Sequence, residues 1–227
     1  MIVNVNVPTS WQELTQKQLY YAYFLLSSEQ YSEDQIKGLC IIRWGKFEGM
    51  LQSIRPEQLA GFLPMMDWLM SIPEYPVRLD EIQGHAALYR PDLQGLPFEQ
   101  YLVLENNYQG YVHTKRIDCL NAMASVLYGA QMQLTAPEAY SVFVWFASIK
   151  QRFASLFSNF FVPSPVSENI GDIGTALRKA MNTQIRALTK GDITKEKEIL
   201  ALDVYRALTE LDAQAEEYNE LKKQIKK

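Results

Sequence analysis

The stretch that decides the fold is residues 135–161, which read TAPEAYSVFVWFASIKQRFASLFSNFF. It opens like a helix, with Thr135 at the capping position, Pro137 in the first turn and the acidic Glu138 beside it. Its first half is apolar on nearly every side, which is typical of a helix in the middle of a bundle. The polar residues 150–152 interrupt it and make it a poor membrane span. The predicted core residues are Phe143, Phe146, Ile149 and Phe153.

Helical periodicity covers most of the remaining chain. Ser10 and Glu13 match a capping box, and Pro64 predicts a kink or break inside the third helix. Near the C-terminus, Gly191 is expected to end one helix and Thr194 to cap the next. Helices are predicted over residues 10–27, 32–45, 56–69, 97–111, 116–128, 135–161, 176–189 and 195–227.

Two segments have the pattern of strands. Residues 2–7 alternate Ile-Val-Asn-Val-Asn-Val, which predicts a half-buried strand that ends at Pro8. Residues 77–90 contain two short apolar runs around Gln83 and Gly84, which predicts a hairpin. We expect the first strand to lie beside this hairpin in one small antiparallel sheet.

The fold class is therefore predicted to be mainly α, a helical bundle with a small antiparallel β-sheet and a C-terminal helical hairpin. Residues 162–174 are rich in proline, serine and glycine, which is typical of a linker. The predicted domain organisation is a helical body over residues 1–161, a linker over 162–174 and a helical hairpin over 175–227.

Composition narrows the classes of function. The chain has a hydrophobic fraction of 48% and a formal net charge of -4, so it can bury a core but has no general attraction for nucleic acid. Its N-terminus lacks the basic and apolar regions of a signal peptide, which predicts a cytoplasmic protein without a membrane partner. Aromatic residues reach 12%, which favours core filling, with an interface role for some of them as the alternative.

Residues that usually carry chemistry are few and scattered. The chain has two histidines and two cysteines, His85, His113, Cys40 and Cys119, and no pair of them has the spacing of metal ligands or of a nucleophile and its base. We therefore predict no metal, no cofactor and no enzymatic activity. Residues expected to have no catalytic role are the acids Asp80, Glu81, Asp203, Glu210 and Asp212 and the glycine-bearing segment 171–174.

The last helix carries an apolar stripe. Its positions are spaced alternately by four and three residues, which is a heptad-like seam, and packing on the preceding helix within the chain would give the same pattern. The residues of the preceding helix expected to cover the first half are Leu177, Met181, Ile185 and Leu188. Tyr218, Leu221 and Ile225 lie beyond the reach of that helix, so they are predicted to contact a second copy of the chain or another protein. The stripe consists of Val204, Leu208, Leu211, Ala215, Tyr218 and Ile225.

Two parts of the chain resemble prophage-encoded proteins of gut anaerobes. Residues 186–200, RALTKGDITKEKEIL, and residues 205–211, YRALTEL, resemble a C-terminal pattern of these proteins. The tyrosine-rich stretch 98–128 is similar to them as well. This resemblance covers about half of the chain and implies a phage structural or tail-assembly protein, without implying any functional residue.

The first hypothesis is thus a non-enzymatic phage or prophage structural or tail-assembly accessory protein that acts through protein–protein contacts. The alternatives are an intracellular adaptor protein without a phage connection and, less favoured, an enzyme whose active site has no sequence motif. Neighbouring genes would separate the first two hypotheses, and an enclosed polar pocket would favour the third.

Overall fold

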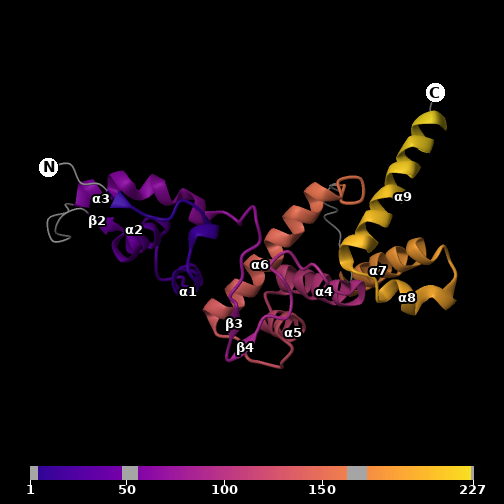
Figure 1. Cartoon of the computed structure of the whole chain (residues 1–227), viewed down its shortest axis with the longest axis horizontal. Coiled ribbons are helices and arrows are strands. Elements are labelled where there is room, and N and C mark those ends of the chain that lie inside the picture. Colours follow the sequence, from indigo (N-terminus) through magenta and orange to yellow (C-terminus); the bar gives the residue numbers. More distant parts are fainter. Residues whose placement is uncertain (1–4, 48–55, 163–172, 226–227) are drawn as a thin grey trace.

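The computed structural model describes residues 5–47, 56–162 and 173–225 of the chain. Over these residues the protein is mainly helical, at 69% helix, with small antiparallel strand pairs, as the sequence predicts. Figure 1 shows an elongated molecule, with the N-terminal helices at one end and the last helix rising from the other. No helix in these ranges is both long and apolar enough to cross a membrane.

The elements follow one another with short connections. The α-helices are α1 (Gln16–Leu26), α2 (Glu33–Trp44), α3 (Pro56–Phe62), α4 (Phe98–Thr114), α5 (Ile117–Tyr128), α6 (Ala136–Leu156), α7 (Ile173–Thr189), α8 (Glu196–Leu200) and α9 (Val204–Ile225). The 3-10 helices are η1 (Trp11–Glu13), η3 (Leu63–Met70) and η4 (Ile193–Lys195). The strands are β1 (Val5–Asn6), β2 (Lys46–Phe47), β3 (Glu81–Ile82) and β4 (His85–Ala86).

The strands form two separate pairs, so the prediction of one sheet is wrong. β1 pairs with β2, with Val5 opposite Phe47, and does not pair with the hairpin. The hairpin itself is confirmed, because β3 and β4 pair around Gln83 and Gly84, both of which have the positive φ angles of the tight turns that suit hairpins. β2 has only two residues, which is too short to show the alternation that identifies a strand in a sequence.

The first helix begins later than predicted. Ser10 makes no capping hydrogen bond, and the carboxylate of Glu13 instead accepts hydrogen bonds from the backbone N–H and the hydroxyl of Thr9, at 2.8 and 2.9 Å. The capping box belongs to Thr15 and Gln18 at the start of α1. Both segments fit the same sequence pattern, and the one directly before the apolar run forms the cap.

Other helix boundaries agree with the sequence. Ser32 and Gln35 cap α2, and Glu138 accepts a hydrogen bond from the backbone N–H of Thr135 at 2.8 Å at the start of α6. The helix that contains Pro64 changes to 3-10 geometry at Leu63, because proline cannot continue the α-helical hydrogen bonds.

The predicted helix over residues 195–227 is two helices, α8 and α9. Between them the chain leaves helical geometry and pairs with the segment before α4: the N–H of Phe98 donates to the carbonyl of Leu202 at 2.7 Å, and the N–H of Val204 donates to that of Leu96 at 2.9 Å. Thr194 is not the cap, because its own N–H and hydroxyl donate to Asp192. The helical hairpin therefore contains an extra helix, and α7 contacts both α8 and α9.

The C-terminal helices pack on the body, since α7, α8 and α9 each contact α4. The predicted linker lies almost wholly outside the described residues, because residues 163–172 are not among them. The proposed division at this segment consequently stays a prediction.

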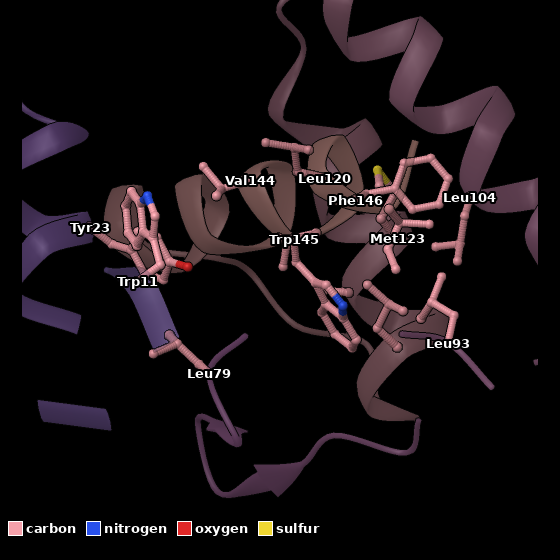
Figure 2. Close-up of a cluster of buried hydrophobic side chains, with 14 of the residues drawn as sticks. Trp11, Tyr23, Leu79, Leu93, Leu104, Leu120, Met123, Val144, Trp145 and Phe146 are labelled. Carbon is pink, nitrogen blue, oxygen red and sulfur yellow. The ribbon is translucent and has the colours of Figure 1, made fainter. Parts of the chain in front are cut away.

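The central position of α6 is confirmed. This helix packs against α1, α4 and α5, and Phe146, Ile149 and Phe153 are buried. Phe143 differs from the prediction, because it is only partly buried and stacks on Tyr108 at the edge of the core. Figure 2 shows side chains of α6 among those of the surrounding elements, with the Trp145 ring reaching into the cluster. Its Nε1 donates to the carbonyl of Pro91 at 2.7 Å, which satisfies the one polar atom of the buried ring.

Truncation of Phe146 to Ala should lower the free energy of unfolding by about 3–5 kcal/mol, because it leaves a cavity in the packed core. Chemical denaturation measures this loss. The matched control is Leu156→Ala on the same helix, whose side chain is exposed and whose loss should stay below about 1 kcal/mol. Equal losses in the two variants would contradict the position assigned to the core.

Candidate functional site

The predicted partner-binding residues lie together on the exposed end of α9. Tyr218 is 63% exposed, Leu221 58% and Ile225 85%. On the same helix the earlier stripe residues Val204 and Leu208, with Leu211, are buried. The stripe therefore changes from buried to exposed along one helix, as the sequence predicts.

Some of the predicted residues of α7 cover the first half of the apolar stripe of α9. Leu188 is buried, and Met181 and Ile185 pack against the same core cluster that contains the early stripe of α9. Leu177 is only half-buried and does not belong to that cluster. In Figure 1, α7 crosses near the base of α9, and the upper part of α9 rises away from it.

Two aspartates fix the position of α9. One carboxylate oxygen of Asp203 accepts a hydrogen bond from the N–H of Gly95 at 2.8 Å, and the other accepts one from the N–H of Tyr205 at 2.9 Å. Asp212 accepts from the backbone N–H groups of Asn159 and Phe160, each at 2.9 Å, just after α6 ends. The sequence gives no sign of these roles, because the partners that join the two acids to the body, Gly95 for Asp203 and residues 159–160 for Asp212, lie more than fifty residues away.

Beyond Asp212 the helix continues for thirteen residues, to Ile225. At a rise of about 1.5 Å per residue this end is roughly 20 Å long. Its helical backbone bonds are already formed, so a partner would not have to order it.

The end of α9 also carries two blocks of charge. Glu216, Glu217 and Glu220 are followed by Lys222 and Lys223. Among the described residues none of these five side chains forms an ion pair. Glu216 and Glu220 are four residues apart, so their like charges are neighbours on the helix surface. Such a pair lowers the stability of an isolated helix. The ammonium of Lys222 lies 5.9 Å from the centre of the Tyr218 ring.

A second apolar surface lies at the other end of the molecule, between α2 and α3. It is a groove of about 440 Å³, and its floor is almost entirely aliphatic. Ile42 lines it and is 45% exposed. Gly38 is buried where α2 meets α3, and a Cβ at that position would lie 3.8 Å from the side chain of Leu59 and 3.9 Å from that of Leu63, which is ordinary van der Waals contact. The described residues that line it are Tyr31, Asp34, Gln35, Gly38, Leu39, Ile42, Pro56, Leu59, Ala60 and Leu63.

The sequence did not predict this groove. Ile42 lies off the helical stripe that identifies the buried face of α2, and the other wall comes from a different helix. A single apolar residue outside a stripe is common on protein surfaces, so it gives no signal by itself.

The residues with potential chemistry are dispersed. His85 and His113 are exposed, and Cys119 is half-buried. Burial raises the pKa of the Cys40 thiol to about 12, so this thiol is a poor nucleophile at neutral pH. Within residues 5–47, 56–162 and 173–225, no three His, Cys, Asp or Glu side chains are grouped as metal ligands.

Buried tyrosines such as Tyr23 and Tyr128 carry hydroxyl groups within the core. Desolvation raises the pKa of Tyr23 well above its usual value, and no partner for its hydroxyl is found among the described residues. The hydroxyl of Tyr128, whose pKa is also raised by burial, donates to the carbonyl of Leu79 at 2.8 Å. Both rings lie in the core and face no described pocket. The most apolar exposed features of the described residues are the row at the end of α9 and the groove between α2 and α3.

No protein-family model, curated protein or solved structure matches the chain.

Replacement of Asp212 by Ala should lower the free energy of unfolding by about 1–3 kcal/mol, because backbone N–H groups after α6 lose a charged acceptor. Thermal or chemical denaturation measures the change. Glu217→Ala on the exposed end of the same helix is the control, and its effect should stay within about 0.5 kcal/mol. If Asp212→Ala behaves like this control, the aspartate does not hold α9 in place.

Proposed function

We propose that this chain is a non-enzymatic protein of the phage or prophage structural or tail-assembly accessory type. It acts in the cytoplasm by binding a protein partner through the end of α9. The observation that carries the proposal is the exposure of Tyr218, Leu221 and Ile225 on a helix whose earlier stripe is buried.

The spacing of these three residues supports a binding role. Positions 218, 221 and 225 are separated by three and four residues, so they lie on one face of the helix. An amphipathic helix that presents such a face commonly binds in an apolar groove of a partner. Isolated apolar residues on a surface need no explanation, whereas Tyr218 and Ile225 continue the stripe that packs into the core earlier on the same helix.

The rigidity of α9 supports the same role. Asp203 and Asp212 fix the helix to the body through hydrogen bonds between 2.8 and 2.9 Å long. A surface that is ordered before binding loses less conformational entropy when the partner arrives. The assignment to a phage or prophage protein rests on the resemblance of residues 186–200 and 98–128, and genes neighbouring this one test it.

Substitution of both Leu221 and Ile225 by Glu should abolish capture of the partner, because two charges then replace the apolar contact. The measurement is affinity capture from the native host with wild-type and variant chains, followed by identification of the bound proteins. The matched control is Ile193→Glu, which places a charge at an apolar residue that is 78% exposed but lies outside α9. This control should retain the partner.

Deletion of residues 216–227 separates binding from stability. We expect the thermal midpoint of the body to change by no more than a few degrees, since Tyr218, Leu221 and Ile225 are exposed, while the partner is lost. Unfolding of the body on deletion would show that the end of α9 is part of the core. Unchanged capture would show that it is a solvated end without a binding role.

A further inference from the structure

We propose that the partner of the α9 end is a second copy of this chain, and that the end binds in the groove between α2 and α3 of that copy. This inference rests on the proposed function and names the partner and its receiving surface. Contacts of this kind would join copies head to tail.

The two surfaces have complementary shapes. The end of α9 is a projecting helix with three large apolar side chains in a row, and the α2–α3 groove is a hollow of about 440 Å³ with an aliphatic floor. Binding of a helix in a groove requires this combination of a convex row and a concave floor.

The last turns of α9 and the rim of the groove have complementary charges. Glu216, Glu217 and Glu220 lie one turn or more before the tip, whereas Lys222 and Lys223 lie beside Leu221 and Ile225, and the sequence continues with Lys226 and Lys227, so the tip itself is basic. Asp34 is the one charged residue among the described residues that line the groove. It follows Glu33 in the first turn of α2, and Glu57 lies in the first turn of α3.

Neither basic residue of α2 is among the described residues that line the groove. Lys37 forms an ion pair with Asp67 at 2.7 Å, and the guanidinium of Arg43 lies 4.7 Å from the centre of the Tyr21 ring. The described rim of the groove therefore suits a helix that carries lysines.

The positions of the surfaces decide how copies would associate. In Figure 1, α2 and α3 lie at one end of the longest axis, and the C-terminal end of α9 lies at the other. The end of α9 therefore cannot reach the groove of its own chain. A contact between different surfaces of identical copies is heterologous, so it produces an open chain or a closed ring rather than a symmetric pair.

The contact would be weak for a single pair of copies. A helix end of about three turns covers less area than the roughly 800 Å² per partner of a standard stable interface. Association should accordingly appear at micromolar or higher concentrations and increase with concentration.

The test uses full-length chains with one surface inactivated at a time. The tail variant is L221E with I225E, and the groove variant is I42E with A60E. All four side chains are exposed in the fold, so the variants should remain folded. Sedimentation velocity over about 5–200 μM measures the mass of each variant and of their equimolar mixture, with circular dichroism as the check of folding.

The wild-type chain should form species larger than a dimer as its concentration rises. Each variant alone should stay a monomer, because it lacks one of the two surfaces. The mixture should form a dimer and nothing larger, since the intact tail of one variant binds the intact groove of the other and no further surface remains. A symmetric pairing of tails would instead leave the groove variant able to associate alone, which would overturn the proposal.

An exchange of charges between the two surfaces tests the proposed electrostatic contact between the lysines and the acidic rim. Asp34→Lys should weaken self-association at least about fivefold, and the further changes K222E and K223E in the same chain should restore it. Higher salt should weaken the wild-type association, because exposed charges are screened. Failure of the exchange to restore association would contradict the assigned pairing of the lysines with the acidic rim.

The outcomes also separate this inference from the proposed function. If the wild-type chain is monomeric at 200 μM while the tail variant loses a different captured protein, the binding role of α9 stands and the second copy is not its partner. If the tail variant loses neither self-association nor any captured protein, both proposals are wrong.

Discussion

The packing of α6 against helices from both halves of the chain is the constraint on which the remaining structure depends. Its rings meet α1 through Tyr140 and Tyr23, whose centroids lie 5.9 Å apart, and α4 through Phe146 and Tyr101, at 6.2 Å. Near its C-terminal end, Phe153 meets Tyr205 of α9 at 5.2 Å. One helix therefore contacts both the base of the projecting helix α9 and α1, which in turn packs on α2 of the groove.

Much of this arrangement could be predicted because it depends on local or periodic signals. The apolar stretch of α6 is long, and Thr135 and Glu138 mark its start, so both its existence and its central position follow from the sequence. Features set by distant partners could not be predicted. β1 pairs with the two-residue β2, and the break before α9 is held by residues 96–98, about one hundred residues earlier. Neither the two-residue β2 nor the break before α9 carries a periodic pattern of its own.

Some residues of the candidate site could likewise be predicted from the sequence, and others could not. Tyr218, Leu221 and Ile225 could be identified because a helix rises by a fixed amount per residue. The long last helix therefore extends beyond the end of the shorter helix that precedes it. Asp212 could not, because its role depends on two N–H groups of a turn after α6 that no sequence pattern joins to α9. The groove was missed for a related reason: its walls come from α2 and α3, and only their packing turns ordinary aliphatic residues into a continuous surface.

The course of α9 explains how one sequence pattern can serve both folding and binding. Over its first half the stripe lies against the body, where burial of Val204, Leu208 and Leu211 stabilises the fold. Past Asp212 the same periodicity continues, but Tyr218 and Ile225 are exposed in the described structure. Because the helix is continuous, the orientation of the exposed row is fixed by the buried one. If the proposed partner binds this row, it meets a surface whose direction is set by the core, and changes in the core that tilt α9 would change that binding without touching a binding residue.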